Sequence, residues 1–303
     1  MNIKATIFGA TMGALGLVGA NSAALAGTTT PPGERAGVDL ATPLPEGVYF
    51  VDLGGIGSDR GAVTKASTFD YNVPIIAWAT PWTIGAGRIQ LIAAAPEASI
   101  AVPSSGPWGP LHNNSAYIRG MYNPFLAAQY AYNFGNGFSA SYLAGAYIAV
   151  DGGNNTNPFD QTTFHQQLAL AYHGGGWNAT ANLMYGIVGN GYGGVHNSDY
   201  FNYDLGLTHT FGKWEVGIIG YGSVTSTINP YYLNGFYQGS TPSASQFALG
   251  GLVGYNFGPV ITQVALSTDV ADHNYGSHAT YLNIHVIIPL WNPEAPKAVV
   301  AKY

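Results

Sequence analysis

Residues 281–291, YLNIHVIIPLW, divide their side chains between two faces of an extended segment. Apolar residues occupy every even position from Leu282 to Leu290, and Asn283 and His285 fall between them. A period of two is the repeat of a β-strand, whose successive side chains point to opposite faces of the sheet. The stretch therefore predicts a strand with an apolar surface on one side and a polar space on the other.

The same pattern recurs in segments of about a dozen residues, separated alternately by short Gly-rich turns and longer polar loops. A closed antiparallel barrel in a membrane explains both features, because closure leaves no unpaired backbone edge in the hydrocarbon. We expect an all-β fold, a transmembrane antiparallel β-barrel of about twelve strands. The expected strands are Gly47–Gly54, Thr68–Thr80, Arg88–Val102, Tyr117–Phe134, Phe138–Val150, Thr162–His173, Trp177–Gly189, Tyr200–Phe211, Trp214–Thr227, Ala244–Phe257, Val260–Ala271 and Ser277–Trp291.

The chain divides into four parts. Residues 1–26 predict a signal peptide, with Lys4 before an apolar stretch and Ala24-Leu25-Ala26 as the cleavage pattern. Residues 27–46 are rich in Thr, Pro and Gly and lack periodicity, which favours a periplasmic N-terminal segment. We expect residues 47–291 to form the outer-membrane barrel and residues 292–303 to form a C-terminal tail.

The composition favours a surface solvated by lipid. Charged residues make up 8% of the 303 residues and hydrophobic residues 47%, whereas soluble domains carry about 25% charged residues. Fifteen acidic against nine basic residues exclude the basic stripe of a nucleic-acid binder. The chain has no cysteine, so its stability rests on the sheet and not on disulfides.

Aromatic residues gather where the expected strands meet the short turns, which predicts an aromatic girdle at one membrane interface. These residues are Trp82, Phe134, Phe138, Trp177, Phe211, Trp214, Phe257 and Trp291.

The expected inward positions are mostly Asn, Gln, Ser, Thr, Tyr, Ala and Gly, unlike the opposed charged rings of diffusion porins. The candidates for lining the lumen and orienting polar groups of a solute are Asp70, Asn72, Arg88, Arg119 and Asp204. The candidates for an apolar mouth in the longest loop are Tyr231, Tyr232, Phe236 and Tyr237.

No catalytic constellation stands out, so the sequence does not predict an enzyme. Ser267, Asp269 and His285 lie on neighbouring expected strands, but any barrel brings such triples together by chance. His273 and His278 are five residues apart, with no carboxylate or cysteine at a metal-ligand spacing. We expect no metal site and no cofactor.

Two stretches resemble a known family. Residues 44–50, LPEGVYF, look like its "P-x-G-x-Y" start of the first strand, and residues 72–82, NVPIIAWATPW, followed by Gly87-Arg88, look like its second-strand signature. These are similar to the MetA-pathway phenol-degradation family of outer-membrane barrels, and His165-Gln166-Gln167-Leu168 fits it loosely. The family's Gly-Leu-Gly-Asp segment before the fourth strand is absent, and Trp108-Gly109-Pro110-Leu111 stands in its place.

The resemblance implies an outer-membrane protein of a Gram-negative bacterium, encoded with aromatic catabolism. We expect an outer-membrane channel for the passive passage of small hydrophobic or aromatic compounds. Two alternatives stay open: a general diffusion porin, and a non-transporting structural or adhesive surface barrel. The expected partners are outer-membrane lipid, a small hydrophobic or aromatic solute, and the barrel-assembly machinery, whose signal is internal or Tyr303 itself.

Overall fold

The computed structural model describes residues 28–61, 67–102, 116–150, 161–189, 198–226, 232–233, 236–237, 243–274 and 277–293. Within these ranges, no helix is long and apolar enough to cross a membrane. The strands are β1 (Gly47–Gly61), β2 (Ser67–Ile84), β3 (Gly87–Ala94), β4 (Glu97–Val102), β5 (Ala116–Met121), β6 (Phe125–Gly135), β7 (Phe138–Tyr147), β8 (Thr163–Gly174), β9 (Trp177–Val188), β10 (Tyr200–Phe211), β11 (Trp214–Thr225), β12 (Tyr232–Leu233), β13 (Phe236–Tyr237), β14 (Ser245–Asn256), β15 (Ile261–His273) and β16 (Ser277–Trp291).

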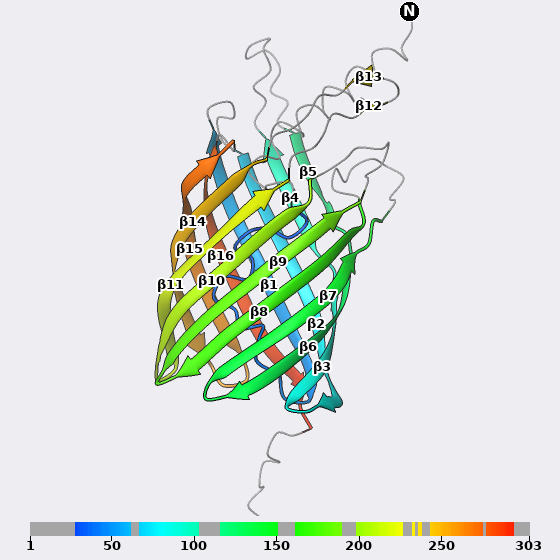
Figure 1. The fold of residues 1–303 in the computed structure, drawn as a ribbon. Coiled ribbons are helices and arrows are strands. Elements are labelled where there is room, and N and C mark those ends of the chain that lie inside the picture. Colours follow the sequence, from blue (N-terminus) through cyan, green and yellow to red (C-terminus); the bar gives the residue numbers. More distant parts are fainter. Residues whose placement is uncertain are drawn as a thin grey trace, which may run out of the picture.

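Fourteen of these strands form one antiparallel sheet, which closes because β1 pairs with both β16 and β2. β3 and β4 pair with successive stretches of β2, while β6 pairs with β3 and β5 pairs with β4. β3 and β4 together thus occupy one strand position in the wall, and β5 and β6 together occupy the next. With each such pair counted once, the described residues form a barrel of twelve strands. Figure 1 shows this closed wall. The prediction of a closed antiparallel barrel of about twelve strands is confirmed.

The outer face of the barrel is apolar. Along β16 the even residues from Leu282 to Leu290 point outward, while Asn283 and His285 are buried inside, each 1% exposed. All eight aromatic residues of the expected girdle are at least half exposed, from Trp177 at 50% to Phe134 at 65%. Lipid is the solvent in which such a surface is stable, so this barrel spans a membrane.

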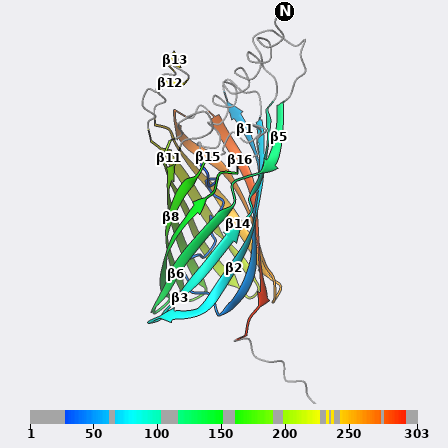
Figure 2. The same cartoon turned by 90° about the vertical axis from the view of Figure 1, so that its right-hand side faces the viewer.

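The two ends of the barrel differ. Tight turns close one end, for example at Gly135-Asn136-Gly137, where all three residues have positive φ angles of 52–85°. Such turns favour Gly and Asn because other side chains are strained in the left-handed region. β1 starts and β16 finishes at this end, and the longer connections leave from the other end (Figure 2).

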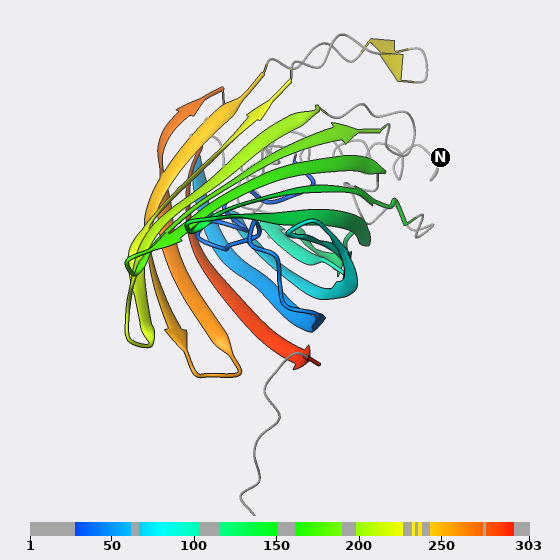
Figure 3. The ribbon, with the colours of Figure 1, turned by 60° about the horizontal axis from the view of Figure 1, so that its bottom comes forward.

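Residues 28–46 do not lie outside the barrel, as a periplasmic segment would. They run through its inside without regular structure, and we call them the plug (Figure 3). Thr29 bonds to Thr163 at the start of β8, whereas Asp39 reaches His173 near its end, so the plug crosses the lumen from the long-connection end to the short-turn end. The sequence shows the lack of periodicity, but it does not show that the wall supplies partners for this backbone.

The plug contributes to both main apolar clusters. Val38 packs in a cluster with Leu53 and the rings of Phe69 and Tyr71. Ala36 packs in a second cluster with Ile219, Tyr221 and Leu252 of β11 and β14. The core of the molecule is therefore the contact between the plug and the inner wall.

Candidate solute pathway

Asparagine side chains of the wall hold the backbone of the plug. Asn202 Nδ2 donates to the carbonyl oxygen of Thr30 at 2.8 Å. Asn182 Nδ2 donates to the carbonyl oxygens of Arg35 and Val38, both at 3.1 Å. Buried backbone groups need partners, and a segment outside the sheet takes them from side chains. The amides of Asn182 and Asn202 thus bind the plug and do not line an open channel.

Asp204 of β10 binds the plug through both carboxylate oxygens. Its Oδ1 accepts the N–H of Gly33 at 2.9 Å, and its Oδ2 accepts the N–H of Arg35 at 2.9 Å. The residue is fully buried, and hydrogen bonds to an ionised acceptor are about twice as strong as neutral ones. Gly33 has a φ of 85°, and a Cβ there would lie 2.6 Å from the ring of Tyr221, so only glycine fits this docking point.

A charged pair follows at the centre of the plug. The Nε atom of Arg35 lies 3.5 Å from Oε1 of Glu34, and both side chains are buried. The Nη1 atom of Arg35 donates to Gln167 and lies 3.4 Å from Nε2 of His165. Glu34 thus pairs with the guanidinium of Arg35, whereas the buried Asp204 binds the backbone N–H of the same residue.

Two contacts hold the short-turn end of the plug. Asp39 Oδ2 lies 2.7 Å from Nε2 of His173 on β8. Glu46 lies 3.8 Å from Nη1 of Arg88, which also donates to the carbonyl oxygen of Thr80 at 2.8 Å. Both ion pairs are partly exposed, so each contributes less than the buried contacts of Asp204.

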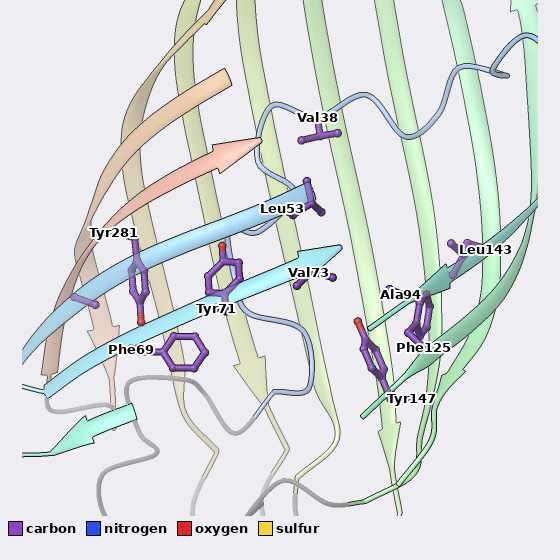
Figure 4. Packing of buried hydrophobic residues seen from close by; sticks show 11 residues of the cluster. Val38, Leu53, Phe69, Tyr71, Val73, Ala94, Phe125, Leu143, Tyr147 and Tyr281 are labelled. Carbon is purple, nitrogen blue, oxygen red and sulfur yellow. The ribbon is translucent and has the colours of Figure 1, made fainter. Parts of the chain in front are cut away.

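An apolar cavity separates the plug from the wall towards the long-connection end. Its empty volume is about 480 Å³, including the space that opens to solvent. The plug lines it with Thr28, Thr29, Pro31 and Glu34, and the wall lines it with Phe69, Tyr71, Val73, Pro96, Glu97, Ala98, Tyr122 and Tyr147. Figure 4 shows Phe69, Tyr71 and Val73 side by side on β2, with the ring of Tyr147 farther along the wall. A concave space lined by aromatic rings with few polar groups has the kind of lining that small-molecule sites have.

The wall beside this cavity is interrupted. Ala94 pairs with Phe125, and Glu97 pairs with Met121. Between these two pairs, the two residues that link β3 to β4 lie opposite the three residues that link β5 to β6. Each gap contains a proline, Pro96 or Pro124, which has no N–H to give to a ladder. The extra residue changes the facing of the strand, as a β-bulge does. Tyr122 and its neighbour Asn123 are therefore both buried, where strict alternation predicts opposite faces.

The five expected lumen residues do not gather at one place. Asp204 points inward and binds the plug, and Arg88 lies near the short-turn end. Asp70 and Asn72 lie on the face of β2 opposite Phe69, Tyr71 and Val73, which is the outer face, so the expectation that they line the lumen does not hold. Arg119 pairs with Ser99 through its backbone, and its side chain lies outside the described part.

The expected mouth residues are not placed by the structure. Tyr231 lies outside the described residues, and so do the side chains of Tyr232, Phe236 and Tyr237, whose backbones form the small pair β12 and β13. The expected signal peptide, residues 1–26, and the tail beyond Pro293 also lie outside.

The cavity residues are the ones that the sequence did not single out. The sequence predicts that the polar residues Asp70 and Asn72 of β2 face the lumen, whereas Phe69, Tyr71 and Val73 occupy the inner face. Two features of the sequence could have indicated the cavity: Pro96 and Pro124, and the alternation of Phe69, Tyr71 and Val73 along β2. Glu34 carried none, because nothing in an irregular segment shows that it enters the barrel.

Comparison with known proteins identifies the family. The family model described as "Putative MetA-pathway of phenol degradation" matches residues 52–282. The chain belongs to this family. The match covers most of the barrel and confirms the resemblance seen in the first two strands. No curated protein matches the sequence significantly.

Solved structures with a similar fold give a second comparison. The COG4313 outer membrane channel from Pseudomonas putida F1 has 14% identity and a TM-score of 0.63, over 82% of this chain and 97% of that chain. The beta domain of the Bordetella autotransporter Brka has 13% identity and a TM-score of 0.46, over 81% and 100%. The TodX deltaS2S3 mutant monoaromatic hydrocarbon channel has 10% identity and a TM-score of 0.44, over 82% and 92%. The fold comparison rests on the first of these.

The location of the protein follows from its fold. A closed antiparallel barrel with an apolar outer face and an aromatic girdle is the architecture of outer-membrane proteins. The protein lies in the outer membrane of a Gram-negative bacterium.

Proposed function

We propose that the protein is a channel through which small hydrophobic or aromatic compounds cross the outer membrane passively. The observation that carries the proposal is the ring-lined cavity between plug and wall, where Phe69, Tyr71 and Tyr147 are each less than 9% exposed. The family description, which names phenol degradation, and the fold shared with an outer membrane channel support it. In this proposal the protein has no catalytic role.

The filled lumen favours this reading over a general diffusion porin. An open porin needs a continuous aqueous path. Here the side chains of Asn182, Asn202 and Asp204 form hydrogen bonds with the backbone of the plug, which fills the lumen. Water and ions gain little from an apolar cavity, whereas an aromatic ring gains about 25 cal/mol for each Å² it buries there. Passage through the lumen then requires the plug to shift.

Single-channel current through the refolded protein in a planar bilayer tests the proposal. We expect the wild type to conduct weakly and phenol to reduce the current in a saturable way. Val73→Ser places an unpaired hydroxyl in the cavity and should weaken the phenol effect by about tenfold. Ile76→Ser is the matched control, because Ile76 lies on the outer face of the same strand.

Two results would contradict the proposal. A large, steady conductance that ignores phenol would identify a general diffusion porin. Equal loss of the phenol effect in Val73→Ser and Ile76→Ser would show that the cavity is not the site.

A further inference from the structure

One wall of the cavity carries a buried carboxylate with unused hydrogen-bonding capacity. Glu34 is 1% exposed and belongs to the cavity lining. Its Oε1 is buried and accepts no hydrogen bond from any described residue; its contact there is the ion pair with Nε of Arg35 at 3.5 Å.

The neighbouring carboxylate shows the contrast. Both oxygens of Asp204 accept backbone N–H groups at 2.9 Å, so Asp204 is satisfied by the fold itself. The guanidinium of Arg35 is shared between several partners. Its Nη1 donates to Gln167 and lies 3.4 Å from Nε2 of His165, so the guanidinium does not serve Glu34 exclusively. A buried acceptor without a donor is unfavourable, and a ligand that brings a donor removes this penalty.

The surroundings decide which donor fits. The cavity is lined mainly by Phe69, Tyr71, Val73 and Tyr147, which suit a flat apolar ring. An ammonium group would have to leave water for this apolar space and would lie close to Arg35. A phenol hydroxyl is neutral, stays protonated near neutral pH as that of tyrosine does, and donates one hydrogen bond.

We propose that the cavity selects aromatic compounds that bear a hydroxyl group, with the ring against Phe69, Tyr71 and Tyr147 and the hydroxyl donating to Glu34. This inference rests on the proposed function and names its substrate class and its specificity-determining residue. Glu34 lies between Gly33 and Arg35, the two residues that Asp204 holds. A phenol bound to Glu34 therefore contacts the plug at its docking point.

The test compares two probes that differ in the donor alone. We would measure the dissociation constants of 4-fluorophenol and 4-fluoroanisole for the full refolded protein in detergent by fluorine NMR, correcting for partition into empty micelles. The wild type should bind the phenol at least about tenfold more tightly, the lower end for a hydrogen bond to a charged group. Glu34→Leu keeps a similar side-chain volume but removes the acceptor. It should weaken the binding of 4-fluorophenol and so bring the ratio of the two dissociation constants close to one.

Controls separate recognition from folding. Glu46→Gln removes another plug carboxylate, which lies at Arg88 and outside the cavity, and should keep the wild-type ratio. If Glu34→Leu does not give a folded, heat-modifiable barrel, Glu34→Gln decides, because its neutral carbonyl should lower the ratio only partly. An unchanged ratio in the folded Glu34 variant would overturn the inference while leaving the channel proposal intact. Absence of saturable binding of either probe to the wild type would overturn both.

Discussion

Asp204→Ala should release the plug without unfolding the barrel. The substitution removes both acceptors of the backbone N–H groups of Gly33 and Arg35. The Asp204 side chain points into the lumen, and within the described residues its hydrogen bonds go only to the plug. The strand ladders of β10 with β9 and β11 use backbone groups instead. The variant therefore changes the docking of the plug more than the wall.

The magnitude follows from these two bonds. A hydrogen bond to a charged group contributes about 1.5–3 kcal/mol, so two contribute about 3–6 kcal/mol. Removing a negative charge close to Glu34 offsets part of this loss, because the like charge disfavours both carboxylates. We take about 3 kcal/mol as the net effect, which lowers the ratio of docked to displaced plug by about two orders of magnitude.

A cysteine reporter measures this ratio. The chain has no cysteine, and Val38 is 2% exposed inside the plug contact, so Val38→Cys creates a single protected thiol. We expect a water-soluble maleimide to label Val38→Cys about 100-fold faster when Asp204→Ala is present, in proportion to the displaced fraction. The single-channel conductance of Asp204→Ala should rise in parallel.

Two controls make the result decisive. Asp204→Asn keeps one acceptor oxygen and should give an intermediate labelling rate. Asp70→Ala, on the outer face, removes a carboxylate that does not touch the plug and should leave the rate unchanged. If labelling and conductance stay the same in Asp204→Ala, the two hydrogen bonds do not hold the plug and the reasoning is wrong.

Three further outcomes follow from the same contacts. Gly206→Ala should raise the basal conductance of the refolded protein, because the new Cβ would meet Cα of Gly37 at 2.6 Å and push the plug from the wall; wild-type conductance would contradict the close approach. His173→Ala should raise it by much less than Asp204→Ala, since the pair with Asp39 is partly exposed and contributes less than about 1 kcal/mol; an equal rise would show that the short-turn end controls the plug. Leu266→Arg, at a lipid-facing position that is 58% exposed, should destabilise the barrel by about 2–4 kcal/mol in urea titrations in lipid; an unchanged midpoint would place Leu266 outside the apolar belt.

The barrel could be predicted from the sequence because its physics is local. Each strand repeats its own period of two, and lipid outside with polar groups inside makes that period visible, as in Leu282–Leu290 against Asn283 and His285. The girdle and the turns follow from single positions such as Trp177 and Gly137. None of these inferences requires knowledge of a distant contact.

The solute site could not be predicted because it depends on distant contacts. Asn182 and Asn202 have the polarity of a water-filled lumen, yet they bond to a segment 147 and 172 residues away in the sequence. On β2, polarity favours Asp70 and Asn72 as lumen residues, whereas the inner face carries Phe69 and Tyr71, which cluster with Val38 of the plug and line the cavity. A period of two separates two faces, but it does not tell which face is inside when both are mixed.

The attachment of the plug sets the order of its release. At the short-turn end the plug continues into β1 at Gly47, whose ladders with β16 and β2 fix that end to the wall. Displacement must then begin at the other end of the described plug, where Thr30 bonds to Tyr147, Tyr200 and Asn202 through neutral groups. Neutral hydrogen bonds are weaker than those at Asp204, so this end loosens first. Because the cavity lies at this end, a bound ring meets the part of the plug that is least firmly held. The contacts of Asp204, Gln167 and Asn182 with the plug are the next that must break before the lumen opens.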